Sequence, residues 1–262
     1  MSTPEGPQAA APVARPEMDE TQGWLHSVES GAAVDGPGMR FVYFMAGCLW
    51  RCLYCHNPDT WKLHGGRRVT LDEAEAEVAS YVGFLRIAGG VTFSGGEPMM
   101  QAGFVGALAR RLKAKHRLHI ALDTQGFLHA ALPDAWFDPI DLALLDIKHT
   151  DPAKHLELTG QPLQPTLDFA RRFVKLGKKM WIRHVLVPGW TDDPVHLNKL
   201  ADIVVGLGPA VERIEILPFH QMGAAKWAAL GQPYRLANHP TPTPEQTAAA
   251  RKIFADRGLT VT

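Results

Sequence analysis

The sequence predicts an α/β fold, a partial (β/α)6 barrel of parallel strands, and three observations lead to it. The chain has 262 residues, close to the roughly 250 that are typical of one α/β barrel. Short β-branched or aromatic runs alternate with longer helical patterns, which favours parallel strands joined by crossovers. Six such units fall short of a closed eight-stranded barrel, so we expect an open or partial one. A doubly wound sheet is the alternative.

Hydrophobic periodicity, turn residues and caps indicate the elements in order. The strand at 142–148 is almost continuously apolar, as expected for a sheet buried on both faces. The first helix opens with Thr70 and Glu73 in capping-box spacing, and the fourth ends near Gly206 and Gly208. The predicted strands cover residues 41–45, 91–93, 119–123, 142–148, 181–187 and 213–217. The predicted helices cover residues 70–86, 101–116, 166–176, 194–205 and a last stretch from Pro244 to about Gly258.

Residues 1–22 form an Ala- and Pro-rich segment with neither a basic start nor an apolar stretch. We expect a disordered tail there and not a signal peptide, followed by one domain over residues 23–262. No apolar run approaches the roughly 20 residues needed to cross a bilayer. The sequence therefore predicts a cytoplasmic protein.

Charge and cysteine content narrow the function. The chain has 27 Lys and Arg residues and 27 Asp and Glu residues, so its formal net charge is zero. A dedicated nucleic-acid binder needs a basic excess to neutralise phosphates, so that class is disfavoured. All three cysteines lie between positions 48 and 55. An odd number of cysteines in one short segment is no disulfide framework; it indicates a reducing compartment and one local piece of chemistry.

Unusual polar residues stand where the predicted strands end. Because the carboxyl ends of parallel strands meet at one rim, we expect these residues to surround a single pocket. Any one of them alone is more often a turn or cap residue, but their coincidence favours a site. They are, in chain order, the cysteine segment, residues 94–97, Asp123, Thr124, Asp146, Lys148 and His220.

The cysteine segment allows four interpretations. Cys48, Cys52 and Cys55 could share a helix face, but the apolar strand before them and the Asn-Pro after them favour a loop. A zinc site would need adjacent Cys55 and His56 to reach two corners of one tetrahedron. Residues 52–56 fit the c-type haem attachment pattern, which leaves Cys48 unexplained. The fourth interpretation is an iron–sulfur cluster on three thiolates, with one iron left open for catalysis.

The C-x-x-x-C-x-x-C spacing, with an aromatic residue before the last cysteine, resembles that of the radical S-adenosylmethionine (SAM) enzymes. From about Gly23 to the C-terminus, further phrases look like those of the pyruvate formate-lyase activating enzyme family. They are residues 34–38 (VDGPG), 94–97 (SGGE), 122–124 (LDT), 145–148 (LDIK), 181–183 (WIR), 187–190 (VPGW) and 217–220 (LPFH). The resemblance implies a partial barrel of the radical SAM type.

The resemblance also implies a role for each matching residue. Cys48, Cys52 and Cys55 would hold a 4Fe–4S cluster whose fourth iron is chelated by SAM. Asp123 and Thr124, with the carbonyl of Leu144, would form a monovalent-cation site. Asp35 would help to seat the peptide substrate. The residues that would contact SAM are Tyr54, His56, Gly95, Gly96, Glu97, Asp146, Lys148, Arg183 and His220.

The activity implied by the resemblance is the activation of pyruvate formate-lyase in anaerobic metabolism. Flavodoxin or ferredoxin would reduce the cluster, and SAM would be cleaved to methionine and a 5′-deoxyadenosyl radical. That radical would remove a hydrogen from one glycine of the partner and leave a glycyl radical. The alternatives are an activator of another glycyl-radical enzyme, a radical SAM enzyme acting on a small molecule, and a non-enzymatic metal or haem carrier.

Overall fold

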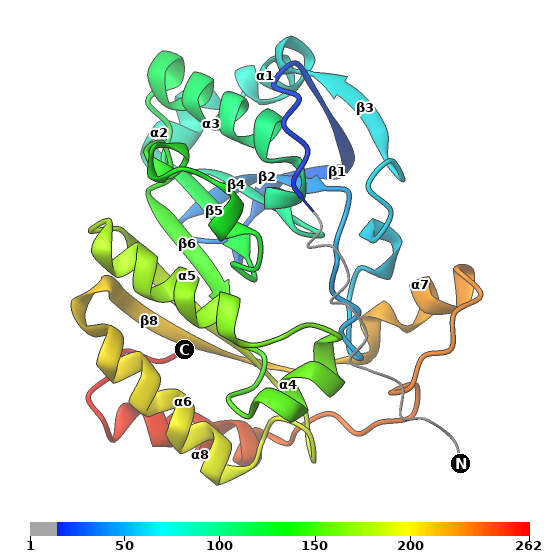
Figure 1. Ribbon diagram of the computed structural model, residues 1–262, viewed down its shortest axis with the longest axis vertical. Coiled ribbons are helices and arrows are strands. Elements are labelled where there is room, and N and C mark those ends of the chain that lie inside the picture. Colours follow the sequence, from blue (N-terminus) through cyan, green and yellow to red (C-terminus); the bar gives the residue numbers. More distant parts are fainter. Residues whose placement is uncertain (1–14) are drawn as a thin grey trace, which may run out of the picture.

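Eight strands form one mixed sheet in the computed structural model, which describes residues 15–262 (Figure 1). Across the sheet the order is β3-β1-β2-β4-β5-β6-β7-β8. The six strands from β2 to β8 are parallel, whereas β1 pairs antiparallel with both β2 and β3. The strands are β1 (Gln22–Ala32), β2 (Met39–Met45), β3 (Arg67–Thr70), β4 (Gly89–Gly95), β5 (Ile120–Thr124), β6 (Leu142–Asp146), β7 (Lys179–Leu186) and β8 (Val211–Pro218).

The parallel strands lie side by side in the order in which they occur in the chain. A doubly wound sheet reverses its strand order at a switch point, and the described strands show no reversal. The sheet begins at β3 and ends at β8, so these two strands are its edges and the barrel is open. The predicted partial (β/α)6 barrel is confirmed, and the doubly wound alternative is wrong.

Helices follow the parallel strands and cover the outer side of the curved sheet (Figure 1). Their apolar faces form one core with the strands: Phe104 of α3 and Phe169 of α5 are buried in the same cluster as Phe93 and Ile182. This packing buries the outer face of the sheet and leaves the strand ends free to form loops. The helices are α1 (Leu71–Ala79), α2 (Val82–Ala88), α3 (Ala102–His116), α4 (Pro152–Thr159), α5 (Gln164–Lys175), α6 (Pro194–Leu207), α7 (Ala224–Ala229) and α8 (Pro244–Ala255).

Several elements differ from the sequence prediction. The helix predicted over residues 70–86 is two helices, α1 and α2, because the chain turns at Ser80 and Tyr81, where the Tyr81 N–H donates to the Val78 carbonyl (2.9 Å). The strands β1 and β3 were not predicted. Two register irregularities interrupt the pairing of β1 with β2, and such bulges disturb the alternation of side chains on which strand prediction depends. The short helices α4 and α7 were also missed.

The N-terminal segment is ordered earlier than predicted. Residues 1–14 lie outside the described residues, but the predicted tail extended to residue 22. The backbone of Glu17 donates to Met100 (2.7 Å) and accepts from Gly103 (2.9 Å), and β1 begins at Gln22. The first turn of α3 has backbone N–H groups without partners inside the helix, and the Glu17 carbonyl satisfies one of them.

The last residues of the chain lie along the outer edge of β8. Val261 forms a parallel bridge with Ile214. The Ile214 N–H donates to the carbonyl of Thr260 (2.9 Å), and the Ile216 N–H donates to that of Thr262 (3.0 Å). The C-terminal residues thus pair with backbone groups of the last strand.

Three histidines are buried together behind the strand ends. The rings of His149 and His196 stack with their centres 3.9 Å apart, and the ring of His184 lies 5.0 Å from His196. The backbone N–H of Thr150 donates to Nδ1 of His196 (3.2 Å). Burial lowers the pKa of His149 to about 4 and that of His196 to about 2. Both rings are therefore neutral in the folded protein at pH 7.

This cluster predicts a loss of stability in mild acid. In an unfolded chain these imidazoles titrate near pH 6.5, so below that pH the unfolded state binds more protons than the folded state. The contribution of these histidines to the free energy of unfolding should therefore be constant above pH 6.5 and fall below it, by up to about 1.4 kcal/mol per pH unit for each histidine. Urea unfolding at pH 5.5 and 7.5 should show a smaller pH dependence for His196→Leu, whereas His64→Gln, which changes an exposed histidine, should keep the parent's. An unaltered pH dependence in His196→Leu would contradict the prediction.

Candidate functional site

A cavity of about 250 Å³ lies where the carboxyl ends of the parallel strands meet. Its wall is formed by the loop after β2, the ends of β4, β6, β7 and β8, and the segments that follow β5, β6 and β8. Residues that are far apart in the sequence thus surround one space. Ten of the residues singled out in the sequence line it: Cys48, Cys52, Tyr54, Cys55, His56, Gly95, Gly96, Asp146, Lys148 and His220.

Backbone hydrogen bonds hold the cysteine loop in place. Gly47 opens it with φ +100°, a conformation that favours glycine, and donates to the carbonyl of Thr60 (2.6 Å). The N–H groups of Arg51 and Leu53 donate to carbonyls in the last turn of α4 (2.8 and 3.0 Å). Those carbonyls have no partner inside the helix. The loop is therefore fixed by elements on either side of it, and the helical interpretation of the three cysteines is wrong.

The three cysteines are free, and two of them are fully enclosed. Cys48 and Cys52 are each 8% exposed, and Cys55 is partly buried. Burial raises the pKa of Cys48 well above its usual value, and the neighbouring Cys52 raises it further. Burial also raises the pKa of Cys52 to about 12, although the Lys148 ammonium acts against this. At neutral pH these groups are therefore protonated thiols, and a positively charged partner is needed to displace their protons.

The donor set fits an iron–sulfur cluster. Within residues 15–262, no group of three or more His, Cys, Asp or Glu side chains is placed so that it could hold a metal ion. In a cubane the thiolates bind different irons, so they do not need to converge on one point. Soft thiolates suit Fe–S iron, and a cationic metal centre deprotonates the thiols that coordinate it. Three buried sulfurs around a cavity match that requirement.

An ion pair forms another part of the cavity wall. Lys148 Nζ lies 2.9 Å from Asp146 Oδ2 and 5.6 Å from the centre of the Tyr54 ring. β6 ends at Asp146, so Lys148 lies just beyond the strand and not within it as predicted. Burial alone would lower the pKa of Lys148, but Asp146 raises it above its ordinary value. The cavity thus holds a fixed positive charge close to Cys52.

Aromatic groups and histidines complete the wall. The His56 and His220 rings meet edge-on with their centres 5.0 Å apart. Burial, and next the proximity of His220, lower the pKa of His56. The Tyr54 hydroxyl is buried and has no hydrogen-bond partner among the described residues. It is an unused polar group that a bound ligand could satisfy.

Two glycines bring the end of β4 against the cysteine loop. Gly95 has φ +102°. The Gly96 N–H donates to the Met45 carbonyl (2.9 Å). A Cβ on Gly96 would lie 2.2 Å from the Gly47 carbonyl oxygen and 3.3 Å from Cys48 Cβ. Only glycine fits at this position, because the neighbour is backbone and cannot move aside.

We expect Gly96→Ala to separate the two loops. The added methyl group would push the cysteine loop away and should lower the free energy of unfolding by about 2 kcal/mol, or the melting temperature by roughly 4–8 °C. Thermal unfolding and the iron bound per chain after anaerobic reconstitution measure the effect. Gly206→Ala is the matched control, because no atom of the described residues lies within 4 Å of a Cβ there. Equal melting temperatures for the two variants would contradict the prediction.

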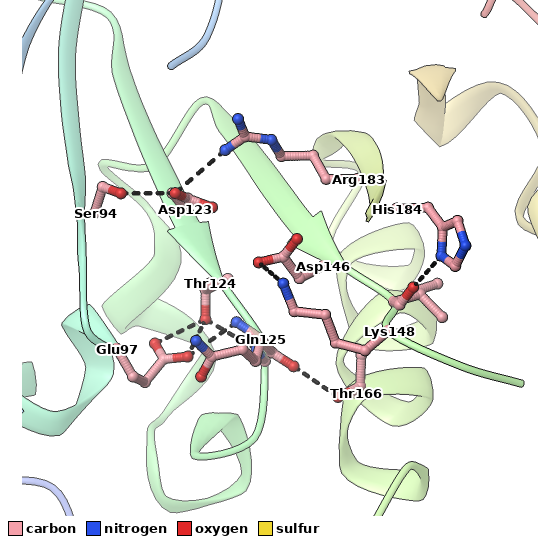
Figure 2. Close-up of polar contacts among 12 residues, drawn as sticks. Ser94, Glu97, Asp123, Thr124, Gln125, Asp146, Lys148, Thr166, Arg183 and His184 are labelled. Carbon is pink, nitrogen blue, oxygen red and sulfur yellow. Dashed lines mark hydrogen bonds and ion pairs between the residues drawn. The ribbon is translucent and has the colours of Figure 1, made fainter. Parts of the chain in front are cut away.

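Glu97 does not line the cavity, although the sequence interpretation placed it against SAM. It is buried and turned inward (Figure 2). Its carboxylate accepts hydrogen bonds from the Thr124 hydroxyl (2.8 Å), the Gln125 N–H (2.9 Å) and the Met99 N–H (3.1 Å). Burial raises its pKa to about 7 against these donors. Glu97 joins the loops after β4 and β5, so its position supports a structural role.

The predicted cation and peptide residues also lie outside the cavity wall. Asp123 accepts from the Ser94 hydroxyl (2.6 Å) and pairs with Arg183 (3.2 Å) (Figure 2). Arg183 also lies 3.3 Å from Glu215. Thr124 is engaged by Glu97, and Leu144 is a buried strand residue. Asp35 is near this group: burial, and then Asp123, raise its pKa to about 6. Protein partners engage the side chains of Asp123 and Thr124, and the cation site at Asp123, Thr124 and Leu144 stays a prediction.

Other residues of the cavity wall were missed. Gln125 follows the predicted Asp-Thr pair, and Phe219 precedes His220, so both stand next to residues that had been selected. Trp50 lies between Cys48 and Cys52 in the sequence. Trp61 comes from the loop that follows the cysteines and is not at the end of a strand. A wider window around each predicted strand end would have found the first two. Trp61 carried no such signal.

The comparisons with known proteins agree with this geometry. Residues 42–201 match the Radical SAM superfamily. The chain belongs to this superfamily. This chain is 47% identical over 245 residues to the pyruvate formate-lyase-activating enzyme of Staphylococcus epidermidis, and the alignment covers 90% of this chain and 97% of the relative. It is 42% identical over 239 residues to the pyruvate formate-lyase 1-activating enzyme of Escherichia coli, covering 90% and 96%.

Solved radical SAM structures share the fold. A domain of a pyruvate-formate lyase-activating enzyme from Bacteroides vulgatus superposes with a TM-score of 0.54 at 25% identity, covering 66% of this chain and 97% of that one. A radical SAM methyltransferase from Sphaerobacter thermophilus gives 0.61 at 19% identity, covering 85% and 65%. The cofactors of the superfamily are a 4Fe–4S cluster and SAM, and the buried thiols around the cavity fit that cluster.

Proposed function

We propose that this chain is a radical SAM activase that installs the glycyl radical of pyruvate formate-lyase. The observation that carries the proposal is the cavity whose wall is shared by the three cysteines, Lys148, Asp146 and Gly96. Relatives named as pyruvate formate-lyase-activating enzymes that align over 90% of this chain support the choice of partner. A glycyl-radical enzyme is the partner class that these relatives indicate.

In this proposal Cys48, Cys52 and Cys55 hold the 4Fe–4S cluster. Bound there with SAM, the cluster would supply the electron for reductive cleavage of SAM, the radical chemistry that activates the partner's glycine. The protein's own contribution is position and electrostatics. No side chain needs to act as a nucleophile or a general base.

The ligand contacts follow from the cavity wall. Lys148 supplies a fixed cation for the SAM carboxylate, and Asp146 keeps that cation charged. The Tyr54 ring offers a face for the adenine, and its free hydroxyl offers a donor. The backbone at Gly95 and Gly96 allows close approach of the ligand. His56 and His220 line the same space.

Arg183 and Glu97 enter the proposal in a different way. Both are held by protein partners in the structure. A SAM contact by Arg183 would require it to leave Asp123 or to share it. Glu97 is proposed to act through Thr124 and Gln125, by fixing the loop that carries the cavity residue Gln125.

We further propose flavodoxin or ferredoxin as the electron donor and the cytoplasm as the location. No helix among residues 15–262 is long and apolar enough to span a membrane. The chain over residues 23–262 is proposed to act as one domain, since all its described strands belong to one sheet.

The test uses the anaerobically reconstituted enzyme with dithionite, SAM and a purified pyruvate formate-lyase. We expect 5′-deoxyadenosine in the solution and an electron paramagnetic resonance doublet of a glycyl radical on the partner. Cleavage of SAM without a radical on the partner would indicate another glycyl-radical enzyme or a small-molecule substrate. No 5′-deoxyadenosine from a cluster-loaded enzyme would refute radical SAM chemistry for this chain.

A further inference from the structure

A second cleft, of about 610 Å³, opens beside the cysteine loop, and we call it the outer cleft. Trp61 belongs both to its wall and to the wall of the inner cavity. The function proposed above uses only the inner cavity and gives the outer cleft no role. Its other lining residues include His26, Arg51, Asp59, Lys62 and Gln232.

Trp61 connects the outer cleft to the cysteines. Its side chain packs against the apolar group formed by Cys48, Trp50 and Cys52. The guanidinium of Arg51 lies 4.7 Å from the centre of the Trp61 ring. Trp61 is thus a wall residue of the outer cleft that packs directly against the cysteine group.

The outer cleft presents positive charge in a chain whose net charge is zero. Arg51 donates to the carbonyls of Cys48 (2.8 Å) and Trp50 (2.7 Å), so its charge is fixed beside the cysteine loop. Lys62 is exposed and has no ion-pair partner among the described residues.

Among residues 15–262, one carboxylate lines this wall, and its charge is already balanced. Asp59 lies 2.9 Å from a ring nitrogen of His26 and 3.1 Å from Lys226 Nζ. The positive charges in this wall that a partner protein can contact are therefore those of Arg51 and Lys62. Complementary charge steers a partner to such a surface and speeds its association.

We propose that the outer cleft is the docking site of an acidic electron-carrier protein, which delivers one electron to the cluster on the Trp61 side. The inference rests on the proposed function. The glycine of a substrate must enter the inner cavity, whereas an electron carrier needs only to come close to the thiolates. Small, charge-steered interfaces are typical of transient redox partners.

One electron passes from the carrier to the cluster in this step. A flavodoxin hydroquinone anion becomes the neutral semiquinone, or a reduced 2Fe–2S ferredoxin becomes oxidised, and the 4Fe–4S cluster gains that one electron. No covalent bond forms or breaks in this step, and no proton is transferred.

The test measures binding of a purified, oxidised flavodoxin to the reconstituted enzyme by isothermal titration calorimetry at low salt. Lys62→Glu should weaken binding at least tenfold, and raising the salt to physiological strength should weaken binding of the parent. Lys175→Glu makes the same change of charge at an exposed position on α5 and should bind within twofold of the parent. Lys62→Gln, a milder change, should lie between the parent and Lys62→Glu.

A kinetic ratio gives the second readout. For each variant, the rate of SAM cleavage driven by reduced flavodoxin is divided by its own rate with dithionite. This ratio should fall at least tenfold in Lys62→Glu and stay constant in Lys175→Glu. Parent-like binding by Lys62→Glu, or equal losses in the two variants, would overturn the docking site. A parent enzyme that fails to cleave SAM even with dithionite would instead refute the proposed function.

Discussion

Replacing Cys52 with alanine is expected to abolish iron loading and to lower SAM cleavage at least 1,000-fold. A cubane on three thiolates leaves no spare protein ligand, since the chain has only three cysteines. Iron should fall from about four per chain in the parent to less than one. Anaerobic reconstitution, iron and sulfide analysis, and chromatography of 5′-deoxyadenosine make the measurement. Cys52→Ser should behave in the same way, because a hydroxyl is a poor ligand for Fe–S iron.

The matched control is Leu49→Ala, which changes the same loop without removing a sulfur. Leu49 is only partly buried, so the loop should still bind iron. Circular dichroism of the apoproteins should show that Cys52→Ala is folded, because the substitution removes one small buried group. If Cys52→Ala still loads iron and cleaves SAM, the cluster assignment is wrong.

Lys148→Met is expected to impair both stability and cofactor use. Lys148 is the one Lys or Arg side chain among the described residues that line the cavity. Removing it leaves Asp146 partly buried without its partner, which costs about 3–5 kcal/mol when a buried pair is broken. It also removes the cation proposed to hold the SAM carboxylate, so kcat/KM for SAM should fall about 100-fold or more, an effect of about 3 kcal/mol. Urea unfolding and steady-state SAM cleavage test the two effects separately.

The double variant Asp146→Asn with Lys148→Met separates folding from binding. It removes the uncompensated carboxylate, so most of the lost stability should return. SAM cleavage should stay low, because the cation is still missing. A single Lys148→Met variant with a parent-like kcat/KM would show that the pair serves the fold alone.

Local sequence signals predicted the parallel part of the sheet and the cysteine loop. Each parallel strand is a short apolar run followed by polar residues, and the chain order of these runs equals their order in the sheet. The three cysteines needed no long-range information, since their spacing within eight residues is itself the motif. This is why the fold class and the convergence of Asp146, Lys148 and His220 could be predicted.

The remaining features depend on contacts that the sequence pattern does not reveal. Glu97 directly follows Gly95 and Gly96 at a strand end, which is the position expected of a ligand-binding residue. Its orientation is instead decided by hydrogen bonds from Thr124 and Gln125, more than 25 residues away. β1 loses its alternation at bulges that arise from pairing with β2. Trp61 reaches the cavity from a loop without regular periodicity. Tertiary hydrogen bonding and packing outweigh local pattern at each of these positions.

The backbone pairing of residues 260–262 with β8 affects how the protein behaves at high concentration. An open sheet has two margins, and an uncovered one is a template on which a second molecule can add a strand and start aggregation. At the β8 edge, residues 260–262 pair with backbone groups that would otherwise be free. At the other edge, β3 is only four residues long and carries Arg67 and Arg68. An incomplete barrel can thus keep its interior accessible without offering an edge for intermolecular strand pairing.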